Sequence, residues 1–161
     1  MSVKDENKLP ELEKRLKKMD GKSVQVGFLG QDFINMIANV HEFGATIKPK
    51  KGKYLAIPTK TGIILKEEVK IPERSFVRTS FDNKQNIKKI VDEAKNVYDL
   101  KIEPNKILDR IGLKMTAEIQ KKIKSNISPA NAPITTEMKG GKTKTLIDTG
   151  RMVQGVTHKI K

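Results

Sequence analysis

The stretch YLAIPTKTGIILKEEV, residues 54–69, decides the fold class that this sequence predicts. Two runs rich in β-branched and other apolar residues, 54–58 and 63–69, flank the turn-forming residues 59–62. This pattern is typical of a β-hairpin, whose two strands pair antiparallel. Antiparallel pairing beside the helices indicated elsewhere favours an α+β fold, with a small and mostly antiparallel sheet of three or four strands.

Further strands are expected near both ends of the chain. Val24, Val26 and Phe28 alternate with polar or small residues, as in a half-buried strand. Residues 156–160 are predicted as a last strand, which follows a short helical turn at residues 149–154. These segments complete the set of strands from which the sheet is expected to form.

Apolar residues at three- and four-residue spacing predict helices in four further segments. They cover residues 9–19, 34–43, 76–98 and 104–123. The third is expected to break near Asp82 and Asn83, and Pro104 suits the first turn of the fourth. The third and fourth helices are long, and we expect them to pack as a pair on one face of the sheet.

The chain is expected to form a single domain, residues 1–161, that begins with an amphipathic helical segment at residues 1–22. The apolar stripe of this helix consists of Leu9, Leu12, Leu16 and Met19. The opposite face, expected in solvent, carries Glu11, Lys14, Arg15, Lys17 and Lys18. Near the other end, residues 128–145 are predicted as an extended loop rich in Lys, Gly and Pro, and such long loops are usually functional or mobile.

Composition limits the kind of protein that the chain encodes. Its 161 residues include 36% hydrophobic and 4% aromatic residues, with no Trp and no Cys. We expect a modest core, with some elements stable only against neighbouring subunits. Because cysteines are absent and there are only two histidines, no disulfide framework, metal site or cofactor is expected. No apolar run approaches the roughly 20 residues that span a bilayer, so a cytosolic protein, or a particle assembled in the cytosol, is predicted.

Net charge is the strongest compositional signal for a partner. The chain carries a formal charge of +14, spread over both of its halves. A basic surface attracts phosphate groups, but aromatic residues interleaved for base stacking are missing. Local concentrations occur in two loops, at Lys50, Lys51 and Lys53 and at Lys139, Lys142 and Lys144. These lysines are interpreted either as parts of solvated loops or as contacts for DNA phosphates or an acidic partner.

The string His41-Glu42-Phe43-Gly44 is a candidate site at the end of a helix. A zinc-protease helix needs a second histidine four residues after the first, and position 45 is alanine. The local sequence instead predicts that His41 lies beside the last carbonyl groups of the helix, where its charge favours the helix dipole. Gly44 is expected to end that helix in the left-handed conformation. Ser75 is expected to cap the helix that follows Pro72.

The string Asp148-Thr149-Gly150 resembles the surroundings of the catalytic carboxylate in aspartic proteases. Those enzymes need two such carboxylates that share one proton, whereas this chain holds the string once. Few residues follow Gly150, and a bulky Arg151 stands where those enzymes carry a small residue, so no enzyme is predicted. Asp148 or Thr149 is interpreted as the cap of a short helix. Asp148 would then hold the turn before the last strand, and Arg151 would pair locally or across an interface.

Several strings occur in an order that resembles one protein family. They are VQVGFL at 24–29, ANVHEFGATI at 38–47, IPERSFVR at 71–78, APIT at 132–135 with Lys142 downstream, and LIDTGRM at 146–152. In this order the chain resembles the virion-morphogenesis family of tailed bacteriophages and prophages, which includes neck and tail-completion proteins. The resemblance covers about residues 23–161, nearly the whole chain.

This resemblance implies a structural protein that forms a ring of identical subunits at the junction of head and tail, without catalytic residues or cofactors. The implied structural or interface residues are His41, Glu42, Phe43, Gly44, Pro72, Arg74, Phe76, Asp148, Thr149, Gly150 and Arg151. The implied partners are other copies of the chain, head-completion or connector proteins, tail terminator or tube proteins, and packaged DNA; no membrane is expected. The implied location is the neck or upper tail of a virion assembled in the bacterial cytoplasm.

Two features depart from the family's pattern. Gly155 stands where a serine is usual, which leaves the end of the last helix open. The Lys-rich hairpin at residues 48–66 resembles an insertion. Two other functions stay open at this point: a tail terminator from the same region of the particle, and a basic nucleic-acid-binding protein.

Overall fold

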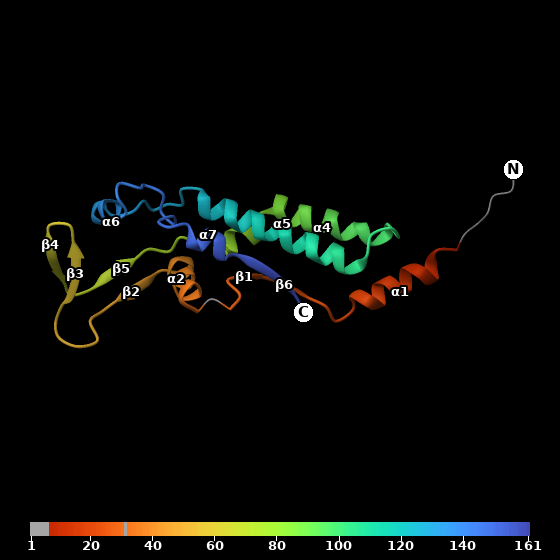
Figure 1. Cartoon of the computed structure of the whole chain (residues 1–161), viewed down its shortest axis with the longest axis horizontal. Helices are drawn as coiled ribbons and strands as arrows, with labels where there is room; N and C mark the ends of the chain where they lie inside the picture. Colours follow the sequence, from red (N-terminus) through yellow and green to blue (C-terminus); the bar gives the residue numbers. More distant parts are fainter. Residues whose placement is uncertain (1–6, 31) are drawn as a thin grey trace.

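The computed structural model describes residues 7–30 and 32–161 and has an elongated shape (Figure 1). Helix α1 (Leu9–Met19) lies at one end, and the hairpin of β3 (Leu55–Thr59) and β4 (Gly62–Lys66) lies at the other. The remaining elements form the body between these two ends. Of the predicted N-terminal segment 1–22, residues 1–6 lie outside the described residues.

Helices and strands alternate in small groups along the chain, and the α+β class predicted from the sequence is confirmed. The other strands are β1 (Val24–Gly27), β2 (Ala45–Ile47), β5 (Val69–Ile71) and β6 (Thr157–Ile160). The other helices are α2 (Asp32–Phe43), α3 (Arg78–Phe81), α4 (Lys84–Ala94), α5 (Pro104–Lys124), α6 (Pro133–Met138) and α7 (Arg151–Gly155), together with the 3-10 helix η1 (Lys95–Tyr98).

In the described part of the chain, the strands pair as three separate antiparallel ladders, β1–β6, β2–β5 and β3–β4. The antiparallel pairing is as predicted, but one sheet of three or four strands is not formed. Each strand has only three to five residues. Between β2 and β3 the chain also turns away from the ladder through Gly52, whose φ of +81° is left-handed. The short ladders therefore remain separate.

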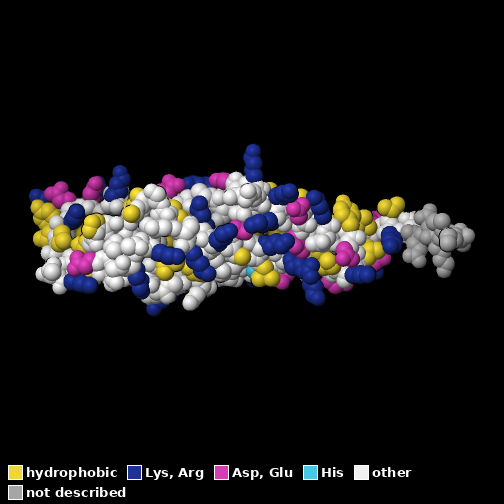
Figure 2. Space-filling model, turned by 90° about the horizontal axis from the view of Figure 1, so that it is seen from above, with side chains coloured by type: hydrophobic (Ala, Val, Ile, Leu, Met, Phe, Trp, Pro, Cys, Tyr) yellow, Lys and Arg dark blue, Asp and Glu magenta, His cyan; other side chains and the backbone are white. Residues whose placement is uncertain are grey.

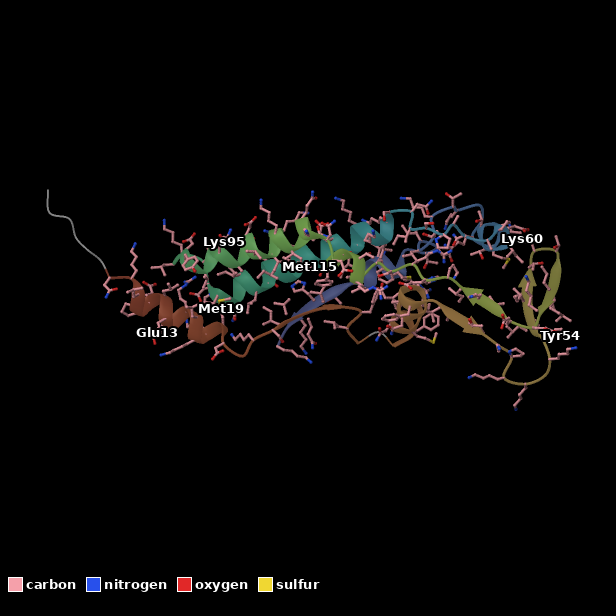
Figure 3. All side chains as sticks on the ribbon, turned by 180° about the vertical axis from the view of Figure 1, so that it is seen from behind. Glu13, Met19, Tyr54, Lys60, Lys95 and Met115 are labelled. Atoms are coloured by element: carbon pink, nitrogen blue, oxygen red, sulfur yellow. The ribbon has the colours of Figure 1, made fainter. Side chains whose placement is uncertain are left out.

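The predicted hairpin is confirmed for residues 55–66 by the pairing of β3 with β4, whereas Val69, expected in its second strand, begins β5 and pairs with β2. Leu55 lies opposite Lys66, and Thr59 lies opposite Gly62 at the turn. The Thr59 hydroxyl closes the turn by donating to the carbonyl oxygen of Gly62 at 2.9 Å. Every residue of β4 is exposed. Figure 3 shows Lys60 at this end of the molecule, far from the helical end.

The body is organised around α5, the longest helix. Helix α5 lies against β1 and β6 on one side and against α4 on another. The two long helices were expected to pack together on one face of the sheet, but only α5 covers the β1–β6 ladder, and α4 packs on α5. Gly112 permits the close approach of β6, because a Cβ atom there would lie 2.3 Å from the imidazole ring of His158. The same imidazole bonds Asp109 through Nε2 at 2.9 Å. The predicted break near Asp82 and Asn83 is present, since the Asn83 side chain caps α4.

The core lies where α2, α5, α7 and β1 meet. Phe28 and Phe76 form its aromatic centre, with ring centroids 6.0 Å apart and planes at 87°. Around them lie the buried side chains of Ala38, Ile119, Ile123, Leu146, Met152 and Val156. The core is small, and its residues come from segments spread over positions 28–156. Its geometry therefore depends on how the connecting segments are positioned as well as on its apolar area.

The N-terminal helix differs from its prediction on both faces. Arg15, expected in solvent, is buried, and its guanidinium donates to four carbonyl oxygens between η1 and α5: Val97 (3.2 Å), Leu100 (3.1 Å), Asp99 (3.0 Å) and Ile102. In contrast, Leu9 and Leu16 of the apolar stripe are exposed. The carbonyl groups after η1 are left free where the helix ends, and the planar donor set of an arginine satisfies them better than leucine would. The polar contact of Arg15 thus holds helix α1 against the chain, while Leu9 and Leu16 stay uncovered.

Contrary to the prediction, the region 128–145 is not an extended loop throughout. It contains α6, which begins at Pro133, where a proline suits the first turn. The helix is followed by Gly140 and Gly141, both left-handed. Further on, the predicted turn at residues 149–154 corresponds to α7, which ends at the buried Gly155.

Candidate functional site

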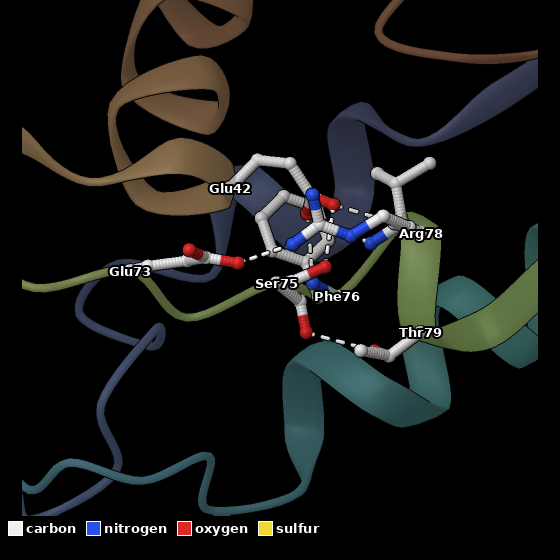
Figure 4. Close-up of polar contacts among 7 residues, drawn as sticks. Glu42, Glu73, Ser75, Phe76, Arg78 and Thr79 are labelled. Carbon is white, nitrogen blue, oxygen red and sulfur yellow. Dashed lines mark hydrogen bonds and ion pairs between the residues drawn. The ribbon is translucent and has the colours of Figure 1, made fainter. Parts of the chain in front are cut away.

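The buried carboxylate of Glu42, in the last turn of α2, lies at the centre of the candidate site (Figure 4). Glu42 is 5% exposed, and its oxygens accept four hydrogen bonds. The donors are the Ser75 hydroxyl at 2.6 Å and the backbone N–H groups of Phe76 at 2.7 Å, Val77 at 2.9 Å and Arg78 at 2.9 Å. One side chain thus satisfies the free N–H groups before and at the start of α3.

This arrangement corrects the prediction that Ser75 caps the following helix. The residue before α3 is Val77, and no side-chain cap is formed locally. Ser75 instead donates its hydroxyl to Glu42, which supplies the capping acceptor from a different helix. The Ser80 hydroxyl, which donates to the Phe76 carbonyl at 2.6 Å, further ties this short helix together.

The hydrogen bonds keep Glu42 ionised. Burial alone would raise the pKa of its carboxyl group, because it removes water from the charged form. The bonds from Ser75, Val77, Arg78 and Phe76 act in the opposite direction, and the net effect is a pKa below the usual value. Glu42 is therefore an acceptor fixed in its charged state.

The neighbouring residues of the 41–44 string bring α2 close to the segment before α3. The backbone N–H of Arg74 donates to the His41 carbonyl at 2.7 Å. Gly44 has a φ of +71°, as predicted, and a Cβ atom there would lie 2.9 Å from the Glu73 nitrogen and 3.0 Å from the Ile71 oxygen. A side chain at position 44 would therefore meet two backbone atoms that cannot move independently.

His41 does not act as the predicted charge at a helix end. Burial is the main cause that lowers its pKa, and the positive charges of Arg74 and Lys139 lower it further. The imidazole is therefore held in its neutral form. Its backbone carbonyl, rather than its ring, makes the structural contact with the 71–78 segment.

Arg74 connects the segment before α3 to the C-terminal region. Its guanidinium is buried, with Nε donating to the Pro129 carbonyl at 2.7 Å and Nη2 donating to the Ala130 carbonyl at 3.0 Å. Burial lowers the pKa of this guanidinium. Pro72, two residues earlier, is partly buried at the end of β5. The 74–78 segment is thus bound to α2 through Glu42 and to the C-terminal region through Arg74.

The lysines of the 139–144 run make backbone contacts within the chain. Lys139 Nζ donates to the carbonyl oxygens of Lys144 and Thr145, both at 3.0 Å. Lys142 Nζ donates to the Asp148 carbonyl at 3.0 Å, and Lys144 Nζ donates to the Lys124 carbonyl at 3.2 Å. These bonds fold the run onto itself. Lys50, Lys51 and Lys53 are exposed beside the hairpin, where Lys53 Nζ lies 5.4 Å from the centre of the Tyr54 ring.

The predicted cap by Asp148 or Thr149 is wrong. The residue before α7 is Gly150, with a left-handed φ of +83°, and no side chain caps this helix. The left-handed turn directs the chain so that both preceding side chains are exposed. Asp148 contributes its backbone oxygen to Lys142 and a longer ion pair of 3.9 Å to the same lysine. Among the described residues, Arg151 forms no ion pair, so the contact expected for it within the chain is not present.

The two strings around positions 41 and 148, far apart in sequence, meet at one cavity. His41 lines a cavity of about 270 Å³ together with Asp148, Thr149, Gly150 and Arg151. Two other candidates lie elsewhere: Phe76 is in the core, and Phe43 is exposed. Sequence reasoning missed Thr145 in the lining of this cavity, because it belongs to no recognisable motif. Glu93, buried between α4 and α5 and bonded to Lys114, was missed for the same reason.

Among the described residues, these strings are surrounded by neither a pair of carboxylates nor a group of metal ligands. Among the described residues that line its cavity, Asp148 has no second carboxylate beside it. Within residues 7–30 and 32–161, no group of three or more His, Asp or Glu side chains is placed to hold a metal ion. Among the helices that the structure describes, none has the length and apolar character needed to cross a bilayer.

Apolar side chains remain exposed on several elements. On α2, Phe33 is 61% exposed, Met36 55% and Phe43 65%, and their spacing places them along one side of the helix. On the hairpin, Ile63 is 70% exposed and Leu65 61%. Figure 2 shows hydrophobic side chains gathered at the hairpin end, while basic side chains are scattered along the whole face. Such patches on a small protein mark surfaces that meet other molecules.

Comparison of the chain with protein-family models, with curated proteins and with solved structures found no match.

Replacing Glu42 by glutamine is expected to destabilise the fold by about 2–4 kcal/mol, because the amide presents an NH₂ group to donors that need an acceptor. The measurement is urea unfolding followed by circular dichroism. Glu73→Gln is the matched control, since it removes an exposed carboxylate that pairs with Arg78 and should cost less than about 1 kcal/mol. Equal losses of unfolding free energy in the two variants would show that the buried Glu42 carboxylate contributes no more than an exposed one.

Stability should also depend on pH through Glu42. The pKa of this group is lower in the folded chain than its usual value of 4.5. Its contribution is therefore complete above the unfolded pKa and is lost as pH falls through the folded pKa. Unfolding free energies measured across the acid range should show the gap between wild type and Glu42→Gln closing at low pH. A gap that stays constant would contradict the assigned ionisation.

Gly44→Ala should cost more than Gly21→Ala, although the two glycines have nearly the same φ, +71° and +70°. At Gly21 the left-handed backbone makes an alanine cost about 1–2 kcal/mol of strain. This strain is the only cost there, because nothing lies within 4 Å of the added methyl group. At Gly44 the methyl group also meets backbone atoms of residues 71 and 73, which adds about 1–3 kcal/mol. Chemical denaturation of both variants measures the difference. Equal costs would mean that the contact between α2 and the 71–73 segment relaxes easily.

Proposed function

We propose that this chain is a structural virion protein of a tailed bacteriophage or prophage, a neck or tail-completion component that forms a ring joining the tail to the head. The ordered strings described above support this family. The proposed partners are other copies of the chain, head-completion or connector proteins, and tail terminator or tube proteins. A tail terminator is the alternative within the same region of the particle.

The main support from the structure is the exposed apolar surface on separate elements of an elongated subunit. The outer side of α2, with Phe33, Met36 and Phe43, and the hairpin, with Ile63 and Leu65, lie in different parts of the molecule. Two different surfaces that meet between copies form a head-to-tail contact, which closes into a ring when the rotation between copies closes. A free two-stranded hairpin is only marginally stable in water, so a neighbouring subunit would also stabilise this arm.

The buried polar groups support a structural role in a different way. Apart from the Ser75 hydroxyl, the hydrogen-bond partners of Glu42 and Arg74 are backbone groups of the same chain. Such contacts fix the position of α2 and of the segment before α3, and with them the surface that the outer side of α2 presents. In this proposal the chain supplies a defined shape to its neighbours, with no enzymatic step.

A second candidate is a basic nucleic-acid-binding protein. The formal charge of +14 and the exposed Lys50, Lys51 and Lys53 beside the hairpin favour it. It predicts that the isolated chain binds DNA with an affinity that falls steeply as salt increases. In the ring proposal, the same lysines contact packaged DNA only weakly and without reading its sequence.

The proposed function is tested by disrupting the gene in its phage or prophage and examining the particles by electron microscopy. We expect DNA-filled heads and complete tails that stay separate, and a loss of infectivity restored by the wild-type gene. Complementation with Phe33→Asp or Leu65→Asp should fail, because each places a charge on a surface proposed to be buried between copies. Thr61→Asp, at the exposed turn of the same hairpin, is the matched control and should restore infectivity.

Joined and infectious particles without this chain would contradict the proposal. Thermal unfolding of the purified variants separates assembly from folding, since both aspartate substitutions lie at exposed positions and should leave the unfolding temperature nearly unchanged. A strongly salt-dependent affinity for DNA, together with normal particles in the disrupted strain, would favour the nucleic-acid-binding alternative.

A further inference from the structure

Two buried polar atoms near the candidate site lack a hydrogen-bond partner within the described residues. They are Nδ1 of His41 and Oγ1 of Thr145. Thr145 is only 3% exposed, so bulk water does not reach most of its side chain. Buried polar atoms are nearly always paired in folded proteins, and an exception indicates a missing partner. These two atoms belong to segments more than a hundred residues apart, which suggests one shared partner.

Both residues line the same cavity. Its volume is about 680 Å³, and it lies between the β5–Arg74 segment and the region 129–145. Arg74 and Lys139 line it as well. The cavity is large enough for a small ligand and its waters. Ile57 and Ile64 of the hairpin form part of its apolar wall.

The polar part of this cavity has an excess of positive charge. Arg74 and Lys139 each lower the pKa of His41 by electrostatic repulsion, which places both cations near the imidazole. Among the acidic residues, Glu68 lines the cavity but pairs with Lys48 at 3.6 Å. The pKa of Lys139 is lowered, mainly by burial, and the nearby charge of Asp148 offsets this only in part. Asp148 also pairs with Lys142 at 3.9 Å. One neutral water would satisfy an unpaired atom without offsetting these charges.

Hydrogen-bond donors are also left over around the cavity. Arg74 uses Nε and Nη2 on carbonyl oxygens, and its Nη1 makes no hydrogen bond to the described residues. Lys139 uses two bonds on carbonyl oxygens and has three protons to donate. The Thr145 hydroxyl and the Nδ1–H tautomer of His41 add two more donors. A ligand rich in acceptors and negative charge matches this set.

We propose that this cavity binds a small tetrahedral oxyanion of the phosphate class. The oxygens of the anion would accept from Arg74 and Lys139, as charge-assisted hydrogen bonds favour. The Thr145 hydroxyl and Nδ1 of His41 are fully buried behind the cavity wall and would join them when these two side chains rotate toward the anion. Arg74 is 5% exposed and Thr145 3%, which places the donors too deep for the backbone of a DNA duplex. The ligand is therefore a free anion. This inference is independent of the proposed role in a virion.

Binding would also have a structural effect. The anion would join three segments that meet at the cavity: the end of α2, the 69–74 segment and the region 129–145. A ligand that binds the folded chain alone raises its stability according to its concentration. Phosphate is thus expected to act as a ligand that fixes the C-terminal region against α2.

The test is titration of the full chain with inorganic phosphate, followed by isothermal calorimetry and by thermal unfolding, with sodium chloride used to keep ionic strength constant. We expect saturable binding with one site and a rise in unfolding temperature beyond that in chloride alone. Thr145→Val keeps the buried shape but removes the hydroxyl, and it should raise the Kd about tenfold. Lys139→Met should raise it at least as much.

Thr143→Val is the matched control, because it removes an exposed threonine hydroxyl two residues away and should leave the Kd unchanged. Absence of saturable binding to the folded wild-type chain at millimolar phosphate would overturn the proposal, and so would an unchanged Kd in Thr145→Val. A short DNA duplex that displaces phosphate at equal phosphate-group concentration would overturn the assignment of a free anion.

Discussion

The structure depends on one buried acceptor, the carboxylate of Glu42. It joins the end of α2 to the beginning of α3 through a hydroxyl and three backbone N–H groups. One of these N–H groups belongs to the buried Phe76, so the contact also fixes the position of the ring that packs against Phe28. A chain with few aromatic residues cannot define its core by apolar area alone. Here a polar contact selects the geometry, and the small core fills the space that results.

Two arginines form buried polar contacts of the same kind at the ends of the body. Arg74 binds carbonyl groups of the segment after α5, and Arg15 binds carbonyl groups between η1 and α5. In each case a planar cation satisfies backbone acceptors that a helix end or a turn has left free. These contacts explain how an elongated molecule with little apolar content keeps its segments together. They also leave apolar side chains on α1, α2 and the hairpin uncovered.

Local patterns predicted the local structure well. The hairpin at 55–66, the break at Asp82 and Asn83 and the left-handed Gly44 all depend on neighbouring residues, and each is present. The wrong cap before α7 is a local failure, since Gly150 takes that position. Two other failures depend on partners distant in sequence. Arg15 has the spacing of a solvent-facing residue, and nothing near it in the sequence reveals the carbonyl groups that it meets 82 to 87 residues later. Likewise, the acceptor for the start of α3 comes from Glu42, 34 residues before Phe76, although Ser75 has the local features of a cap.

The two ends of the molecule carry the chain's only tyrosines. Tyr54 precedes the hairpin and Tyr98 ends η1 beside α1, and both are exposed. Because the chain has no Trp, the fluorescence excited in the absorption band of tyrosine, at longer wavelengths than phenylalanine absorbs, arises from these two phenol rings and is silent about the core. Emission from the native protein therefore reports on its tips. Substituting either tyrosine by phenylalanine leaves a spectroscopic signal from one tip alone, without adding a dye.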